Sequence, residues 1–281
     1  MSVRLPSPAL PFVLASVVLC GFGRCETPVV DPIDTSAPWQ LVWSDEFDGP
    51  AGQSPDASKW TYDEGGSGWG NNQLEFDTKR PENVALDGQG NLAIVARAES
   101  YGGRNYTSAR IKTQRLFERT YGRFEARLKL PSGQGLWPAF WLLGADIGTT
   151  GWPACGEIDI MEYRGQTPLT TQGSLHGPGY SGGGAIWTQW SLPGPAGFDD
   201  DFHVFAVDWD PTRLRWEVDG VVYQTVTSDH LPSGAPWVFD SPFFIILNVA
   251  VGGGFVGSPD ATTRFPQSML IDYVRVYQRG A

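Results

Sequence analysis

The sequence predicts an all-β fold in which two antiparallel sheets pack face to face. Its 281 residues include 35 Gly, 22 Pro and 12 Trp, a composition rich in turns and in large flat side chains. That composition is typical of sandwiches and barrels. Several segments alternate apolar with polar residues, as half-buried strands do, whereas segments with the period of an amphipathic helix are hard to find.

The predicted strands are distributed along the chain after residue 40. They cover residues 41–47, 91–98, 109–113, 121–130, 202–210, 213–220, 243–251 and 270–278. The tripeptide VDG at 218–220 is a hairpin signal within this series. Two glycine-rich loops, 63–77 and 176–187, also carry aromatic and amide side chains. Long loops of this kind usually build a functional site.

The chain divides into three predicted parts. Residues 1–24 carry a basic residue, Arg4, near their start, followed by an apolar run from Ala9 to Leu19, which is the pattern of a secretory signal peptide. Residues 25–38 contain three prolines and read as a short linker, and residues 39–281 form one domain. We expect a secreted protein in which Cys155 is a buried free thiol, although pairing with Cys25 stays open.

The charge balance restricts the class of partner. A formal net charge of −11 repels nucleic acids and anionic membranes, so a neutral ligand fits best. We expect no membrane contact once the signal is removed, and a monomer. The spacing of the His and Cys residues matches no zinc site.

The segment GEIDIMEYRG, 156–165, carries three carboxylates on a predicted strand. Because strand side chains alternate, Glu157 and Asp159 share one face and Glu162 should point away. A β-bulge around Ile160 and Met161 inserts one residue and returns Glu162 to the face of Glu157. Two carboxylates on either side of a bond are the groups that hydrolyse glycosides. The alternative is that these acids form an ordinary solvated face.

Four separated motifs in this order closely resemble the laminarinases, the bacterial-type endo-β-1,3-glucanases of glycoside hydrolase family 16. They are WGNNQLEF at 69–76, GQGLWPAFWLLG at 133–144, GEIDIMEYRG and LIDYVRVYQ at 270–278. The resemblance runs from about Trp39 to Gln278 and implies a β-jelly roll with a concave substrate cleft. It also implies retaining hydrolysis of β-1,3-glucan without a catalytic cofactor. Glu157 matches the nucleophile, Glu162 the general acid/base, and Asp159 the residue that orients the nucleophile.

Further residues complete the predicted site. Trp137 and Trp141 are four apart, so a strand places both on one face, where indole rings can stack on sugar rings. The resemblance places both next to the carboxylates, assigns Asn72 and Arg110 to sugar hydroxyls on the non-reducing side, and places His176 near the point of scission. It also implies a structural calcium ion held by Glu46, the Gly90 carbonyl and Asp272, which are hard oxygen ligands.

Two alternative functions remain at this stage. A mixed-linkage β-1,3-1,4-glucanase is disfavoured because such relatives usually have the shorter Glu-x-Asp-x-Glu spacing. A β-1,3-glucan-recognition protein binds the polymer without hydrolysing it, and such proteins typically lack one or both glutamates. Here both Glu157 and Glu162 are present.

Overall fold

The computed structural model describes residues 37–280. The predicted signal peptide and all but the last two residues of the predicted linker therefore lie outside the described residues, as does Cys25. No helix of the described part is long and apolar enough to cross a membrane.

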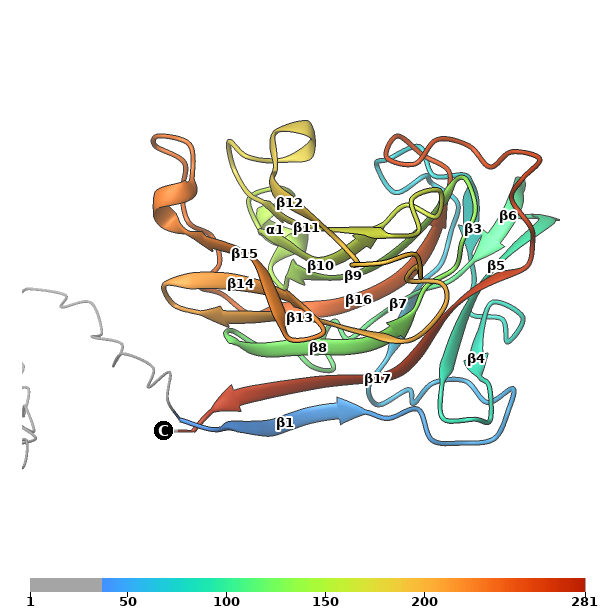
Figure 1. Ribbon diagram of the computed structural model, residues 1–281, viewed down its shortest axis with the longest axis horizontal. Helices are drawn as coiled ribbons and strands as arrows, with labels where there is room; N and C mark the ends of the chain where they lie inside the picture. Colours follow the sequence, from blue (N-terminus) through green and yellow to red (C-terminus); the bar gives the residue numbers. More distant parts are fainter. Residues whose placement is uncertain (1–36, 281) are drawn as a thin grey trace, which may run out of the picture. The chain divides into compact units, whose positions relative to one another are not determined.

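Two sheets account for nearly all of the regular structure, and they lie one above the other in Figure 1. The upper sheet has seven strands in the order β12-β11-β10-β9-β16-β7-β2. These strands are β2 (Thr61–Asp63), β7 (Arg110–Lys112), β9 (Leu136–Gly144), β10 (Glu157–Tyr163), β11 (Thr170–His176), β12 (Ile186–Ser191) and β16 (Phe243–Val251). All pairs in this sheet are antiparallel.

The lower sheet has ten strands, with β15-β14-β13-β8-β17-β5-β6-β3 as its main path, while β1 pairs with β17 and β4 with β5. The strands are β1 (Trp39–Asp45), β3 (Glu75–Asp77), β4 (Val84–Leu86), β5 (Leu92–Tyr101), β6 (Arg104–Ser108), β8 (Gly122–Lys129), β13 (His203–Asp210), β14 (Arg213–Val218), β15 (Val221–Thr227) and β17 (Gln267–Arg279). In this sheet β3 and β6 pair in parallel.

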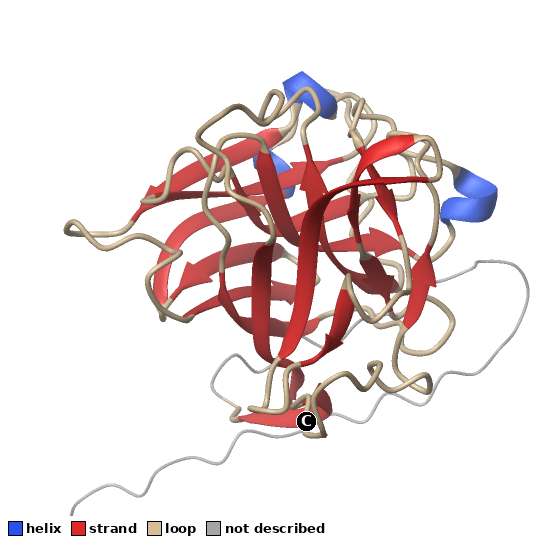
Figure 2. Cartoon of the chain, turned by 90° about the vertical axis from the view of Figure 1, so that its right-hand side faces the viewer, coloured by secondary structure: helices blue, strands red, loops and turns tan. Residues whose placement is uncertain are grey.

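Helices are few and short among residues 37–280. Helix α1 spans Ile147–Thr150, and the 3-10 turns η1 and η2 span Gly182–Gly184 and Ser228–His230. Figure 2 shows them at the periphery of the strands. The prediction of an all-β fold with two packed antiparallel sheets is therefore confirmed.

Each predicted strand overlaps an observed one, and the range 243–251 coincides with β16. The predicted hairpin at 218–220 is also present, because Val218 pairs with Val221 across the turn between β14 and β15. Its two central residues, Asp219 and Gly220, have φ values of 50° and 77°. A two-residue hairpin turn of type I′ requires positive φ at both positions.

The hydrophobic core fills the space between the two sheets. Alternate residues of the strands meet there, among them Ile158 of β10, Phe140 of β9 and Phe124 of β8, all fully buried. Cys155 is buried and has no disulfide partner among residues 37–280, and its predicted state as a free thiol stays a prediction because Cys25 lies outside them. Because the core occupies one face of the seven-stranded sheet, the residues of alternate parity on β9, β10 and β11 point to the opposite face. We call that opposite face, which bears Glu157, Asp159 and Glu162, the carboxylate face.

Candidate active site

A β-bulge in β10 brings the three carboxylates to one face. In the pairing with β9, Glu157 lies opposite Leu143, Asp159 opposite Trp141 and Glu162 opposite Ala139. The partners on β9 are evenly spaced by two residues, so they share one face. On β10 the last step takes three residues, and the register also shifts between Asp159 and Glu162 in the pairing with β11. The bulge predicted at Ile160 and Met161 is therefore present.

The bulge is stabilised from the core side. Ile160 and Met161 are both buried, with exposed fractions of 1% and 0%. Two consecutive apolar side chains can both enter the core only if the strand departs from strict alternation. Also from the core, the indole Nε1 of Trp216 donates a hydrogen bond of 2.8 Å to the Asp159 carbonyl, at the start of the irregular segment.

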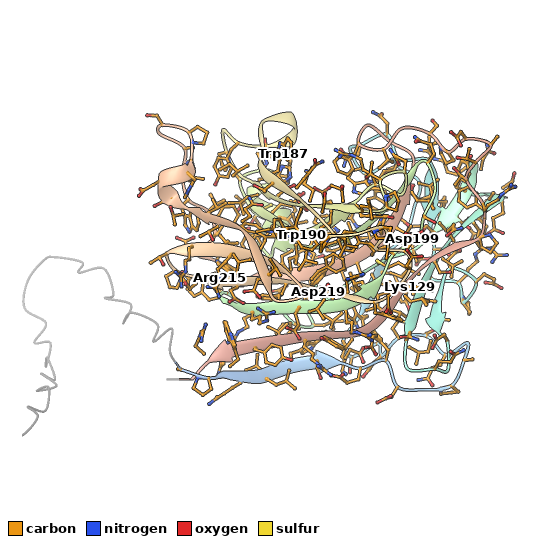
Figure 3. All side chains as sticks on the ribbon, in the orientation of Figure 1. Lys129, Trp187, Trp190, Asp199, Arg215 and Asp219 are labelled. Carbon is orange, nitrogen blue, oxygen red and sulfur yellow. The ribbon has the colours of Figure 1, made fainter. Side chains whose placement is uncertain are left out.

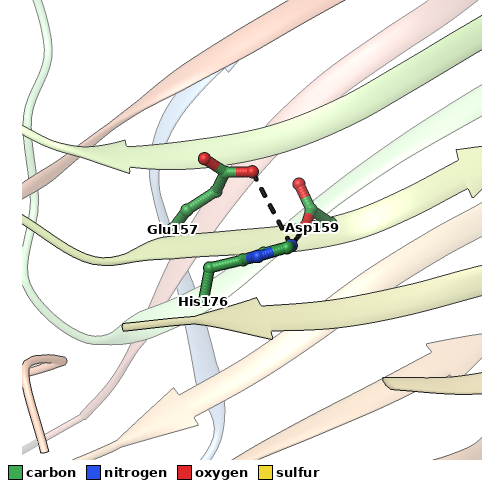
Figure 4. Close-up of side chains that lie close together, drawn as sticks. All are labelled: Glu157, Asp159 and His176. Atoms are coloured by element: carbon green, nitrogen blue, oxygen red, sulfur yellow. Dashed lines mark ion pairs between the residues drawn. The ribbon is translucent and has the colours of Figure 1, made fainter. Parts of the chain in front are cut away.

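His176 lies beside the first two carboxylates (Figure 4). Its Nε2 is 3.0 Å from Oδ2 of Asp159 and 3.9 Å from Oε1 of Glu157. Its Nδ1 accepts a hydrogen bond of 3.1 Å from the backbone N–H of Gly182. Because Nδ1 is an acceptor, Nε2 carries the ring proton and presents it to Asp159. The loop 176–187 thus fixes the tautomer of a histidine at the site.

The two glutamates have different hydrogen-bond partners. Oε2 of Glu157 accepts a bond of 2.8 Å from the indole Nε1 of Trp152. Oε2 of Glu162 accepts a bond of 2.9 Å from Oγ of Ser174, which in turn accepts a bond of 3.0 Å from Nε2 of Gln172. Each carboxylate is therefore oriented by a side chain from outside β10.

Burial and mutual repulsion raise the pKa values of all three acids. Burial is the larger cause for Glu157, followed by the charge of Asp159, and the two raise its pKa to about 8. The pKa of Asp159 is raised well above its ordinary value by burial and then by Glu162, and burial also raises the pKa of Glu162. Three carboxylates this close cannot all ionise near neutral pH, so the group retains a proton that can serve an acid-catalysed step.

Aromatic and cationic groups occupy the next strands of the carboxylate face. The indole Nε1 of Trp141 donates a bond of 2.8 Å to Oδ1 of Asn248. The Arg110 guanidinium lies between two rings, 4.7 Å from the centroid of Trp141 and 4.9 Å from that of Trp69. Its Nε is 3.0 Å from Oδ2 of Asp63. Arg110 is thus held rigidly beside Trp141, as a residue that positions a sugar should be.

Two predicted sugar-binding residues remain, Trp137 and Asn72. Trp137 lies on the same face as Trp141, as predicted from the spacing, but only 8% of it is exposed and its ring packs 4.8 Å from that of Phe255. Asn72 is exposed on the loop between β2 and β3, with a φ of 58°. The structure therefore places Trp141 and His176 beside Asp159, with Arg110 against Trp141. The side chain of Trp137 lies close enough to Glu162 to lower its pKa, and Asn72 lies on a loop.

Several residues of the site were not predicted. Trp152, Ser174 and Asn248 each contact a predicted residue, and Asp63 pairs with Arg110. Ser174 is two residues before the predicted residue His176, so it shares a face with His176 once that segment is known to be a strand. No local signal pointed to Asn248, because its approach to Trp141 depends on the pairing of two strands more than 100 residues apart.

The predicted calcium ligands are engaged by arginines. Oε1 and Oε2 of Glu46 accept bonds of 3.1 and 2.7 Å from Arg275, and Oδ2 of Asp272 accepts one of 2.6 Å from Arg127. Gly90 lies in the turn between β4 and β5. These carboxylates fit a cation only if the guanidinium groups withdraw. In residues 37–280, the cluster of three acidic or histidine side chains close enough for a metal ion is Glu157, Asp159 and His176.

Comparisons with known proteins agree with this architecture. The chain is 44% identical over 259 residues to a β-glucanase of Rhodothermus marinus, covering 88% of each chain. It is 49% identical to the catalytic domain of an endo-1,3-β-glucanase (laminarinase) from Thermotoga petrophila, with a TM-score of 0.82 over 87% of this chain and all of that one. It is 46% identical to an endo-β-1,3-glucanase from Pyrococcus furiosus, with a TM-score of 0.83 over 91% of this chain and all of that one.

The profile of the glycosyl hydrolases family 16 matches residues 58–275, a range that includes every strand of the carboxylate face. The fold is accordingly the jelly roll shared with these solved neighbours, and no described strand of the seven-stranded sheet falls outside the matched range. By this match, and by its identity to the β-glucanases over most of its length, the chain belongs to glycosyl hydrolase family 16.

Proposed function

We propose that the protein is an endo-β-1,3-glucanase that hydrolyses internal bonds of a laminarin-type glucan with retention of configuration. The observation that carries the proposal is the bulge in β10, which brings Glu157 and Glu162 to one face of the sheet. Retaining hydrolysis needs two carboxyl groups about 5–5.5 Å apart on the two sides of the scissile bond. The identity of the chain to proteins named as endo-1,3-β-glucanases supports the linkage.

In the first step, Glu162 donates its proton to the glycosidic oxygen while the Glu157 carboxylate attacks the anomeric carbon. The bond to the leaving sugar breaks, its electron pair goes to the protonated oxygen, and a glycosyl ester forms on Glu157. Ser174 holds Glu162 in place, and Trp152 holds Glu157. All three acids have raised pKa values, and we place the proton that the group retains on Glu162 for this step.

In the second step, Glu162 takes a proton from water, and the water oxygen attacks the anomeric carbon and releases Glu157. Asp159 lies between the two glutamates and carries the contact to His176. We assign it to orienting Glu157 and to tuning its charge. Its repulsion on Glu157 weakens when the ester forms, because an esterified glutamate bears no charge.

We assign the aromatic and amide groups to sugar binding. Trp141 and Trp137 provide ring faces beside the carboxylates, Arg110 and Asn72 bind hydroxyl groups on the non-reducing side, and His176 lies at the point of scission. The contact of Arg110 with Trp141 and the contact of His176 with Asp159 support the inner part of this assignment.

We further propose that the enzyme is secreted as a monomer and needs no cofactor for the chemistry. Calcium at Glu46, Gly90 and Asp272 stays a proposal for stability alone. If Ca²⁺ binds, Arg275 and Arg127 must release the two carboxylates, whose hard oxygen atoms would then hold the ion. The ion would be remote from the chemistry of Glu157 and Glu162.

A reducing-sugar assay on laminarin, mixed-linkage β-1,3-1,4-glucan and cellulose tests the proposal. We expect laminarin to be cleaved fastest, with a rapid fall in polymer length that marks internal cleavage. Faster hydrolysis of the mixed-linkage polymer would identify that activity instead. Binding of laminarin without release of reducing ends would identify a recognition protein.

A further inference from the structure

An exposed tryptophan lies on the carboxylate face beyond His176. Trp187 belongs to β12, the edge strand of the seven-stranded sheet, and is 51% exposed. Burial along β12 alternates strictly, with Trp187 and Gln189 exposed while Trp190 is partly buried against the core. Figure 3 labels both tryptophans of this strand. A single exposed indole is common on protein surfaces, so a role for Trp187 depends on where the residue lies relative to the acids.

The strand register fixes the position of Trp187 relative to the acids. Trp187 pairs with Ser174 of β11, and Ser174 pairs with Asp159 of β10. Paired residues of neighbouring strands point to the same face, so Trp187 and Asp159 share the carboxylate face. They are two strand spacings apart, roughly 10 Å. Trp141 pairs with Asp159 from the opposite side.

The carboxylates therefore lie between two aromatic platforms. Trp141 and Arg110 lie on the side of β9, β16 and β7, which the proposed function assigns to the non-reducing part of the glucan. Trp187 lies on the side of β11 and β12. A sugar chain that crosses the strands above Asp159 places its reducing-end part over His176 and then over Trp187.

The chemistry of this second side suits an uncharged sugar. Apart from His176, the residues of β11 and β12 that share the face are neutral: Thr170, Gln172, Ser174, Trp187, Gln189 and Ser191. Hydroxyl and amide groups bind sugar hydroxyls, and an indole covers the apolar face of a pyranose ring. A sulfated or carboxylated sugar would find no fixed cation on these two strands.

We propose that Trp187 forms a binding subsite for the second sugar on the reducing-end side of the scissile bond, with a neutral β-glucosyl unit as its ligand. The inference rests on the proposed function and extends it to the leaving-group side. A pyranose ring is about as wide as one strand spacing, roughly 5 Å, so the first leaving sugar lies over β11 and the second over β12.

This position has two kinetic consequences. Binding of the leaving part at Trp187 contributes to the first step for long substrates, because remote binding energy lowers the barrier at the reacting bond. The same subsite holds an acceptor sugar when the glycosyl ester on Glu157 is transferred to a second glucan rather than to water. In that transfer the acceptor hydroxyl gives its proton to Glu162, and its oxygen forms the new glycosidic bond to the anomeric carbon. The ester bond to Glu157 breaks, and its electron pair returns to the Glu157 carboxylate.

The variant Trp187→Ala tests the subsite, with Trp187→Phe as the conservative variant. Two substrates are compared: a β-1,3-glucan oligosaccharide long enough to cross both sides, and an aryl β-laminaribioside whose small leaving group does not reach β12. The matched control is Trp39→Ala on β1, whose ring is partly buried under Arg279 in the other sheet. The ratio of transglycosylation to hydrolysis is measured at high acceptor concentration.

We expect Trp187→Ala to lower kcat/KM on the long substrate about tenfold, which corresponds to the loss of one stacking contact. The aryl glycoside should be unaffected, the transglycosylation ratio should fall, and Trp187→Phe should recover most of both. Trp39→Ala should change neither measurement.

Equal kinetics of wild type and Trp187→Ala on the long substrate would overturn the inference and leave the proposed function intact. An equal loss on both substrates would also overturn it, because a structural effect on the acids would then account for the result. A wild-type protein that hydrolyses neither substrate would refute the proposed function, and the subsite with it.

Discussion

The indole Nε1 of Trp152 donates a hydrogen bond of 2.8 Å to Oε2 of Glu157, from a loop residue to the first residue of β10. This bond favours the ionised form of Glu157 and opposes the burial that raises its pKa. Trp152 is 49% exposed and its ring centroid lies 6.0 Å from that of His176. A solvent-accessible residue therefore helps to set the charge of the proposed nucleophile.

Replacement of Trp152 by Phe should shift the acidic limb of the pH profile of kcat/KM to higher pH. Without the indole N–H, the Glu157 carboxylate loses a donor, so its pKa rises further above the ordinary value. Less of the nucleophile is then ionised at neutral pH. The measurement is kcat/KM of an aryl glycoside from pH 4 to pH 9, and a limb that stays in place would show that this bond does not tune Glu157.

Replacement of Asp159 by Asn should shift the same limb to lower pH. After burial, the charge of Asp159 is the largest cause that raises the pKa of Glu157, and the amide removes it. The rate at the optimum should also fall, because the amide alters the contact with His176. The two variants thus shift one limb in opposite directions, and a shift of both in the same direction would contradict the electrostatic account.

The two glutamates should separate in an azide experiment. Glu162→Ala should reduce laminarin hydrolysis roughly 10²–10⁴-fold, because the departing sugar oxygen lacks its acid. An activated aryl glycoside leaves unaided and still forms the glycosyl ester. Azide, which needs no base, should restore turnover and give a β-configured glycosyl azide.

The matched variant is Glu157→Ala, which removes the covalent step. Hydrolysis of every β-linked substrate should stop, whatever the leaving group. Azide that enters the space left by Glu157 attacks the anomeric carbon directly and should give an α-configured product. A β-azide from Glu157→Ala, or an α-azide from Glu162→Ala, would show that the two roles are assigned in the wrong order.

Calcium should raise the melting temperature if it binds at Glu46, Gly90 and Asp272. A ligand that binds only the folded state stabilises it by about 2.7 kcal/mol at one hundred times its dissociation constant. The test is a thermal melt with chelator, with Ca²⁺ and with Mg²⁺, on the wild type and on Glu46→Gln. If the melting temperature of the wild type is the same with and without Ca²⁺, the prediction of a calcium site at these residues is wrong.

Glu75 should make the folded state less stable as pH rises. It is 1% exposed on β3, one oxygen accepts a bond of 2.7 Å from the Val251 N–H, and burial raises its pKa to about 7. The folded state therefore binds more protons than the unfolded state between about pH 4.5 and pH 7. The contribution of Glu75 to the free energy of unfolding is therefore largest below that pH range and is lost as the pH rises through it.

The variant Glu75→Gln keeps an acceptor for Val251 and removes the titration. Its free energy of unfolding relative to that of the wild type should rise between pH 4.5 and pH 8, by an amount on the order of 3 kcal/mol at most. The solvent-exposed Glu82 supplies a control, Glu82→Gln, with the same change of charge. A constant difference across this range would mean that Glu75 is ionised in the folded protein at all of these pH values.

The sequence by itself determined the class of fold and the three acids proposed for catalysis. Apolar runs and turn signals are local properties, so the strand at 243–251 and the hairpin at Asp219 and Gly220 could be predicted within a few residues of their bounds. The three acids on one short strand, with the motifs around them, indicated glycoside hydrolysis and the family. The shared face of Trp137 and Trp141 followed from strand parity alone.

The tertiary structure decided how those residues act together. Strand parity turns Glu162 away from Glu157, and only the register of β10 against both β9 and β11 places the bulge that returns it. The contacts of Trp152 with Glu157 and of Asn248 with Trp141 join segments whose approach depends on chain packing. The raised pKa values have the same origin, because burial and the distances between charges are properties of the packed sheets and are absent from any local stretch of sequence.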